Sequence, residues 1–86
     1  MARYEVLIKP SALKELESVG TRKLRRNLVE RAEALADNPR PQGCTKLAGG
    51  ERYRVRHGAY RLVYSVDDER RIVLVVKIGH RKGVYR

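Results

Sequence analysis

Arginine dominates the one segment of this sequence whose residue types and spacing could do chemistry. Within residues 52–64 it stands at four positions: Arg52, Arg54, Arg56 and Arg61. A two-residue turn at Gly58-Ala59, with Gly first as a type II′ turn requires, folds the segment into a hairpin in which Arg56 faces Arg61. Since side chains alternate between the faces of a strand, all four arginines share one face. Like charges placed directly opposite one another destabilise a sheet, so the pattern indicates an anionic ligand, most simply phosphate.

The other face of the same hairpin carries its apolar pairs. The same turn makes Val55 face Leu62 and Tyr53 face Tyr64. Both tyrosines are therefore expected in the core and not as platforms for stacked bases. A solvated basic strand that only raises the net charge is the alternative reading of the arginines, and it suits a single arginine better than four on one face.

Composition narrows the range of partners. The 86 residues carry 20 Lys+Arg against 10 Asp+Glu, a net charge of +10, which favours nucleic acid, an anionic membrane or an acidic protein. The longest apolar run, Ile72 to Val76, is far shorter than the ~20 residues that span a membrane, so no membrane partner is expected. No leader for export opens the chain, and Cys44 is the only cysteine, which excludes an internal disulfide and a thiolate metal cluster. A cytoplasmic location is expected.

Two helices are expected near the amino terminus. The first begins around Pro10, which suits the first turn of a helix, and ends at Gly20. Thr21 can cap the second, which stops before Asn38-Pro39 because the residue before a proline disfavours helix. Apolar residues at helical spacing define the faces toward the core: Ala12, Leu13, Leu16 and Val19, then Leu24, Leu28, Ala32, Leu35 and Ala36.

Four strands complete the expected fold, at residues 4–8, 52–57, 60–66 and 71–78. The last is apolar on both faces and is expected to be central, whereas residues 40–50 are expected to form a loop. The order β-α-α-β-β-β predicts one α+β domain over residues 1–86, with two N-terminal helices packed on one face of a small, mostly antiparallel sheet. The other face stays open, and the arginines point there.

This order of elements and four motifs resemble the RelE/ParE superfamily, the small toxins of type II toxin–antitoxin systems. The motifs are Leu47-Ala48-Gly49, the strand from Tyr53 to Arg56, Tyr60-Arg61-Leu62-Val63-Tyr64, and the segment from Ile78 to Tyr85. The resemblance covers essentially the whole chain. It implies one of two activities: RelE-like members enter the ribosomal A site and cut mRNA without a metal, whereas ParE-like members inhibit DNA gyrase and generally lack the catalytic set.

In RelE-like members the functional residues lie at defined positions of the fold. Two basic residues on the first hairpin strand, an arginine on the second, an arginine after the last strand and a tyrosine near the end fall here on Arg54, Arg56, Arg61, Arg81 and Tyr85. The hairpin pair is often lysine in the family. Arginine hardly loses a proton near neutral pH, so that pair is not expected to transfer protons. No metal and no cofactor is expected.

Cleavage of RNA without a metal requires the 2′-OH to attack the adjacent phosphorus while protons move. Arg61 and Arg81 can donate several N–H groups to phosphate oxygens, and such contacts strengthen as charge builds. Two residues could take the proton: Tyr85, if cations lower its pKa from about 10, and His80, whose pKa near 6.5 suits the task. The structural alternatives are that His80 caps the strand and that Tyr85 packs its ring on the sheet. Further phosphate contacts are expected from other basic residues: Arg52, Arg54, Arg56, Lys46 and Lys82.

The sequence thus predicts a ribosome-dependent mRNA endoribonuclease of the RelE type. An antitoxin is expected to neutralise it by laying an acidic or amphipathic segment across the basic face. Two rivals stay open, a gyrase inhibitor of the ParE type and a catalytically silent RNA- or protein-binding domain on the same scaffold. Arg61, Arg81 and Tyr85 argue against the gyrase inhibitor, because ParE-like members generally lack them.

Overall fold

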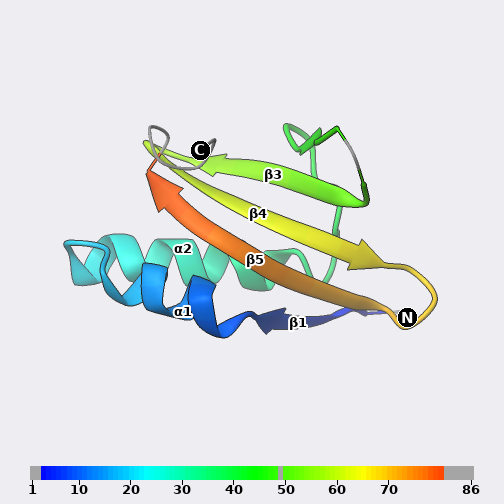
Figure 1. Ribbon diagram of the computed structural model, residues 1–86, viewed down its shortest axis with the longest axis horizontal. Coiled ribbons are helices and arrows are strands. Elements are labelled where there is room, and N and C mark those ends of the chain that lie inside the picture. The colour runs from blue at the N-terminus through cyan, green and yellow to red at the C-terminus, as the bar shows by residue number, and fades with distance from the viewer. Residues whose placement is uncertain (1–2, 49, 81–86) are drawn as a thin grey trace.

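The computed structural model describes residues 3–48 and 50–80, in which two helices lie against a five-stranded sheet (Figure 1). In chain order the elements are β1 Glu5–Ile8, α1 Pro10–Glu17, α2 Arg22–Ala34, β2 Thr45–Lys46, β3 Arg52–His57, β4 Tyr60–Asp67 and β5 Ile72–His80. The strand order is β1-β5-β4-β3-β2, with β1 parallel to β5 and the other neighbours antiparallel. The expected α+β fold is confirmed, and the last strand lies inside the sheet as predicted.

Both helices begin where the sequence predicts. Proline stands in the first turn of α1, and the Thr21 side chain caps α2 by accepting a backbone N–H at 3.1 Å. The first helix ends at Glu17, earlier than the expected end at Gly20. The chain tightens there, because the Val19 N–H bonds the Leu16 carbonyl at 3.1 Å and carries the Val19 side chain into the core.

The hairpin of β3 and β4 has the register that the sequence predicts. Arg56 pairs with Arg61 and Tyr53 with Tyr64. Gly58 adopts φ +61°, the left-handed value that the first position of a type II′ turn needs. The turn chemistry and the alternation of faces were therefore sufficient to place every pair of this hairpin.

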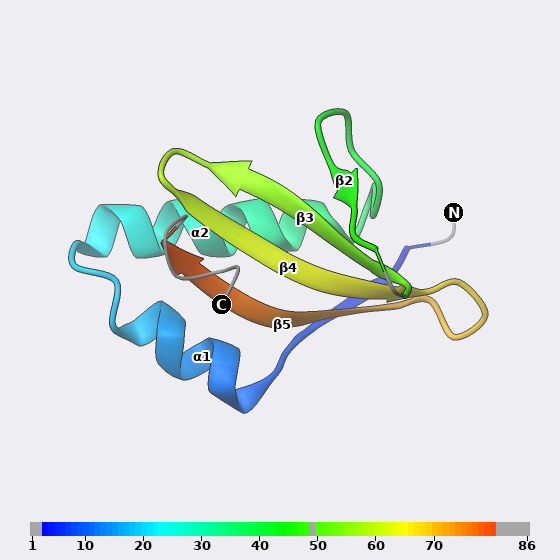
Figure 2. The same ribbon diagram turned by 45° about the horizontal axis from the view of Figure 1, so that its top comes forward.

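The segment 40–50, expected to be a loop, also contains β2. Thr45 pairs with Arg54 and Lys46 with Tyr53, so β2 extends the sheet at the edge away from α1 (Figure 2). The expected element order therefore lacked one strand. Two residues are too few to show the alternation by which a strand is recognised.

The core lies between the helices and the face of the sheet that carries Tyr53 and Tyr64. Their rings stack with centroids 5.8 Å apart, and Tyr64 is fully buried, which confirms both as core residues. Leu13 is the exception among the predicted core positions, since 44% of it is exposed. It lies about 100° around α1 from Ala12, which is the residue that faces the sheet. The remaining core side chains come from both layers: Leu16, Val19, Leu28, Ala32, Leu35, Val55, Leu62, Val66, Val73, Val75 and Ile78.

An irregularity in β5 changes which residues share a face. Opposite the adjacent residues Val63 and Tyr64 of β4 stand Lys77 and Val75, so Val76 is an extra residue on β5. Such a bulge interrupts the strict alternation of a strand. Beyond Val76, side chains therefore lie on the faces opposite to those of an uninterrupted strand.

Candidate functional site

The open face of the sheet gathers the arginines of β3 and β4. Arg56 pairs with Arg61, and Arg61 pairs in turn with Gly79 of β5, so these residues form one row across three strands. Arg54 and Arg52 follow at alternate positions of β3, on the same face. All four arginines are exposed or half-buried. The predicted cluster is thus present, and its guanidinium groups can contact phosphate from the side away from the helices.

The bulge of β5 decides what stands beside Arg61. Without the extra residue Val76, the register would place Ile78 next to Arg61. With it, the neighbour is Gly79, which has no side chain. A glycine within a strand commonly marks a place where a ligand or another backbone comes close. The position beside Arg61 on β5 therefore carries no side chain.

The register of β2 places the adjacent residues Thr45 and Lys46 on opposite faces of the sheet. Thr45 pairs with Arg54, and its Oγ1 lies 3.5 Å from Arg54 Nη2, at the long end of the range for a hydrogen bond. Lys46 instead pairs with Tyr53 and so takes the core side of the sheet, where it is exposed. Thr45, which was not expected at the site, thus shares the arginine face in place of Lys46. No sequence signal pointed to it, because β2 itself was not expected.

His80 lies on the opposite face from Arg61. It pairs with Tyr60, and the two rings meet edge to face with centroids 5.6 Å apart. Tyr60 in turn packs against the core. This placement follows from the bulge, which puts Gly79 and not His80 on the arginine side. The other candidates of this segment, Arg81, Lys82 and Tyr85, lie outside the described residues.

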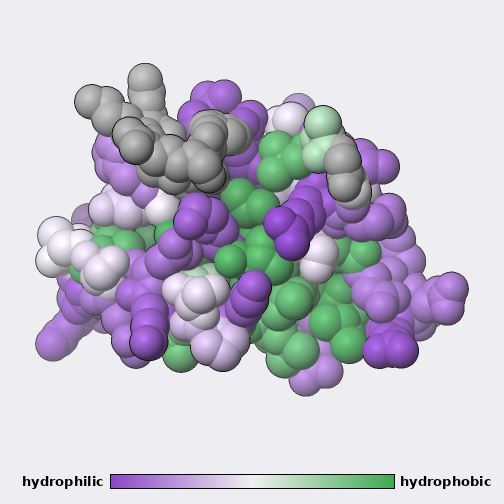
Figure 3. Space-filling model, in the orientation of Figure 1, coloured by the Kyte–Doolittle hydropathy of each residue, from purple (hydrophilic) through white to green (hydrophobic). Residues whose placement is uncertain are grey.

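Apolar side chains occupy the β1 and β5 part of the open face. Leu7 pairs with Leu74, and 41% of Leu7 is exposed. In Figure 3 apolar surface lies over the middle of the sheet, with hydrophilic side chains around it. Apolar side chains thus share the open face with the arginines of β3 and β4.

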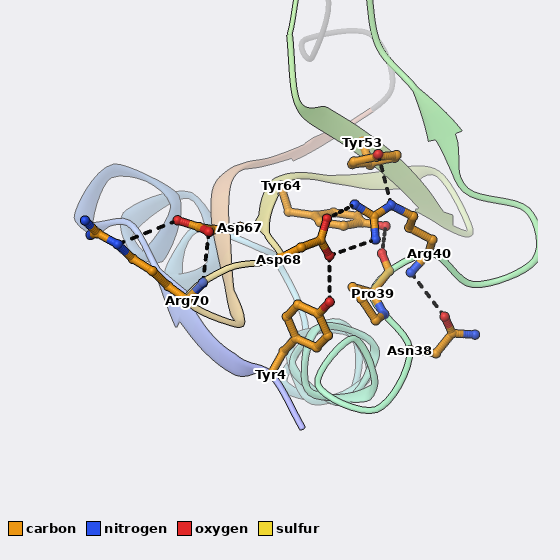
Figure 4. Close-up of polar contacts among 9 residues, drawn as sticks. All are labelled: Tyr4, Asn38, Pro39, Arg40, Tyr53, Tyr64, Asp67, Asp68 and Arg70. Carbon is orange, nitrogen blue, oxygen red and sulfur yellow. Dashed lines mark hydrogen bonds and ion pairs between the residues drawn. The ribbon is translucent and has the colours of Figure 1, made fainter. Parts of the chain in front are cut away.

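A different arginine environment lies at the end of the hairpin remote from its turn (Figure 4). Arg40 donates two hydrogen bonds to Asp68, Nη2 to Oδ2 at 2.8 Å and Nη1 to Oδ1 at 3.2 Å. Its Nε donates to the Tyr53 hydroxyl at 3.0 Å, and the guanidinium carbon lies 5.1 Å from the centre of that ring. Tyr4 donates to Asp68 Oδ1 at 2.6 Å. Arg40 therefore ties the segment after α2 to β3 and to the turn between β4 and β5.

These contacts also set protonation states. Hydrogen bonds from Arg40 and Tyr4 lower the pKa of the Asp68 carboxyl, and the bond to Asp68 raises the pKa of the Tyr4 phenol. Burial raises the pKa of Tyr64, whose hydroxyl donates to the Pro39 carbonyl at 2.7 Å. Asp68 is held charged and both phenols neutral, which is the state that each hydrogen bond requires.

Residues 3–48 and 50–80 contain neither a cluster of metal-ligating side chains nor a helix that could span a membrane. No group of three His, Cys, Asp or Glu side chains in this part of the chain could hold a metal ion. No helix there is long and apolar enough to cross a membrane. Cys44 carries a free, half-buried thiol.

The fold and its basic open face define a class of small toxins. The family model described as the ParE toxin of the type II toxin–antitoxin system parDE matches residues 6–85. The chain belongs to the RelE/ParE superfamily of type II toxins, as the sequence resemblance implied.

Similar proteins extend over nearly the whole chain. RelE1 of Methanocaldococcus jannaschii is 33% identical over 88 residues, which cover 98% of this chain and 97% of that protein. The RelBE2 toxin–antitoxin complex of Mycobacterium tuberculosis contains a chain with a TM-score of 0.83 and 27% identity, with 94% of each chain covered. The archaeal RelE–RelB complex of Pyrococcus horikoshii OT3 gives a TM-score of 0.82 and 29% identity, covering 98% of this chain and 100% of that one. The family model thus carries the ParE name, whereas these similar proteins carry RelE names.

Proposed function

We propose that this toxin is a RelE-type endoribonuclease that cleaves mRNA on the ribosome and so inhibits translation. The observation that carries the proposal is the row formed by Arg56, Arg61 and Gly79. Two permanent cations stand opposite one another, beside a strand position without a side chain. Such a pair destabilises the free sheet, and a bound phosphate offsets the repulsion.

The proposed reaction is a transesterification within the RNA strand. The 2′-oxygen bonds to the adjacent phosphorus, the bond from phosphorus to the 5′-oxygen breaks, and a 2′,3′-cyclic phosphate and a 5′-hydroxyl result. Arg61 and Arg81 donate N–H groups to the phosphate oxygens, where negative charge increases in the transition state. Arg54 and Arg56 hold flanking phosphates, with Arg52 and Lys82 at the margins.

Tyr85 is the proposed base that removes the 2′-OH proton, and solvent returns a proton to the departing 5′-oxygen. Arginines at positions 54 and 56 keep their protons and cannot do this. The pairing of His80 with Tyr60, on the face away from Arg61, supports Tyr85 over His80. To act as a base Tyr85 needs cations beside its phenol, and Arg81 is close to it in the sequence.

An antitoxin is the proposed partner that neutralises the toxin. Both solved complexes described above, RelBE2 and archaeal RelE–RelB, pair a similar chain with its antitoxin. A net charge of +10 favours a partner segment rich in carboxylates over the arginines. Leu7 and Leu74 on the same face suit an amphipathic segment that is apolar along one side.

Inhibition of DNA gyrase is the second candidate function. The matching family model carries the ParE description, and guanidinium groups contact the phosphates of DNA as well as those of RNA. The resemblance favours the nuclease, because ParE-like members generally lack the set that falls here on Arg61, Arg81 and Tyr85.

Primer extension on mRNA tests the proposal directly. The purified protein is incubated with mRNA alone, with mRNA on translating ribosomes, and separately with gyrase and plasmid DNA. New 5′ ends that form only with ribosomes, together with unchanged gyrase activity, are expected. Inhibited gyrase with intact mRNA would instead select the ParE-type function. Intact mRNA together with unchanged gyrase activity would leave a silent binding domain.

A further inference from the structure

The outer edge of β5 changes its partner halfway along the strand. β1 covers this edge only as far as Val75, which pairs with Ile8 and accepts the Lys9 N–H at 2.9 Å. The chain then turns into α1 at Pro10. Among the described residues, no strand pairs with the outer edge at residues 76–80. A strand edge left without a neighbour needs other partners for its backbone groups, above all where it is buried.

Glu15 of α1 supplies that partner. Its Oε1 accepts the N–H of Ile78 at 2.9 Å, and its Oε2 lies 2.9 Å from the ammonium nitrogen of Lys77. α1 packs directly on β5, and only 2% of Ile78 is exposed. The carboxylate thus replaces the carbonyl oxygen that a further strand would have offered.

The contact with Glu15 lies at the bulge of β5, where the alternation of its side chains between the two faces shifts by one residue. Val76 is the extra residue of the bulge, and Lys77 and Ile78, both bonded to Glu15, are the next two residues. A shift of register by one residue moves every side chain of a strand to the other face. Loss of the bulge would return Ile78 to the position beside Arg61.

We propose that Glu15 is a positioning residue that holds β5 in its bulged register and thereby keeps Gly79, and not Ile78, beside Arg61. The inference rests on the proposed function, because the position beside Arg61 matters only if Arg61 contacts RNA. Glu15 works through the backbone of Ile78, and the ion pair with Lys77 is secondary. That pair is substantially exposed, at 40% for the Lys77 side chain and 34% for the Glu15 side chain, and exposed ion pairs contribute little.

Substitutions at two positions separate the hydrogen bond from the charge. Glu15→Ala removes both contacts, whereas Glu15→Gln keeps an amide oxygen for the Ile78 N–H and loses the charge. Glu15→Asp keeps the charge but draws the oxygens back by one methylene. Lys77→Gln removes the ion pair alone. Glu17→Ala, at an exposed position of the same helix, is the matched control.

Three quantities are measured: the single-turnover rate on ribosome-bound mRNA, the half-saturating ribosome concentration, and amide exchange at Ile78 in the free protein. Glu15→Ala is expected to lower the rate about ten- to a hundred-fold, as when catalytic groups are misplaced, with little change in half-saturation. Glu15→Asp should behave similarly, and Ile78 should exchange faster in both. Glu15→Gln, Lys77→Gln and Glu17→Ala should keep nearly the wild-type rate.

A wild-type rate in Glu15→Ala, together with fast exchange at Ile78, would overturn the positioning role. Glu15 would then only supply an acceptor for the Ile78 N–H. Equal losses in Glu15→Gln and Lys77→Gln would show that charge carries the effect, against the proposal. If Glu15→Ala fails to fold, the contrast between Glu15→Asp and Glu15→Gln decides in the same way. A wild-type protein that cleaves no mRNA would overturn the proposed function, and the positioning role with it, before any variant is compared.

Discussion

Arginines at the two ends of the β3–β4 hairpin stand in opposite electrostatic environments. Far from the turn, Arg40 lies against the carboxylate of Asp68 and the hydroxyl of Tyr53. Next to the turn, Arg56 faces Arg61 across the sheet. The residue type is the same at both ends, so only the neighbours distinguish an arginine that holds the fold from one that is proposed to bind a ligand.

The difference predicts effects of opposite kind. A compensated arginine adds to the stability of the free protein, and its loss should leave the chemistry unchanged. Arg61 lies opposite a like charge, and its proposed role is to contact phosphate, so its loss should remove activity without unfolding the chain. Substitution at each end therefore tests the assignment of both.

Arg61→Ala is expected to have the largest effect. Removal of one donor that stabilises transition-state charge typically lowers a rate about 10²- to 10³-fold. Cleavage of ribosome-bound mRNA should fall at least that far, while the melting temperature stays constant or rises slightly because a like-charge pair is relieved. Primer extension and thermal unfolding are the two measurements.

Arg26→Ala is the matched control for Arg61→Ala, since Arg26 is exposed on α2, away from the open face of the sheet. It removes the same charge and should keep nearly full activity. A variant at Arg61 that unfolds would show that Arg61 belongs with Arg40 as a structural residue.

The next effect concerns the proton path. Tyr85→Phe keeps the ring but removes the hydroxyl, and loss of the general base is expected to lower the rate by about 10²-fold. His80→Gln should be mild, because His80 pairs with Tyr60 on the face away from Arg61. Single-turnover cleavage by both variants across pH distinguishes them. The reverse ranking would assign the base to His80, and full rates in both would leave catalysis to orientation and charge alone.

The hairpin could be predicted from the sequence because local rules determine it. Gly58 requires a particular turn, the turn sets the register, and the register puts the arginines on one face. Thr21 as a helix cap was equally readable. Each of these features depends on neighbours in the chain.

The features that the sequence did not predict depend on contacts between distant segments. The residues around Val76 are apolar on both faces, so their pattern gives no sign of where a bulge changes the phase. Glu15 reads as an ordinary solvated residue of α1 until its contact with Ile78 is seen. Arg40 reads as part of a loop, although it joins segments up to 28 residues away. Such interactions have no local signature.

Arg40→Ala tests the compensated end and should have a smaller effect. An exposed ion pair contributes up to about 1 kcal/mol, so its loss should lower the melting temperature of a domain this size by up to about 4–8 °C. Cleavage should stay near the wild-type rate. Arg70→Ala is the control, since Arg70 is 80% exposed and its Nε lies 4.0 Å from Asp67. It should leave the melting temperature unchanged. An Arg40 variant that keeps its stability but loses activity would reverse the comparison.

The smallest expected effect is the pH dependence of that stabilisation. Arg40 and Tyr4 lower the pKa of Asp68 below its ordinary value of 3.8. A lowered carboxyl pKa stabilises the folded state at every pH above the ordinary value, and this stabilisation is lost as the pH falls through the folded value. The difference in melting temperature between wild type and Arg40→Ala should therefore be constant from neutral pH down to about 5 and shrink below about 4. Asp68→Asn, which has no carboxyl to protonate, should remove this dependence at the same position. A difference that persists unchanged to about pH 2 would mean that the contacts with Tyr53, and not the charge of Asp68, hold Arg40 in place.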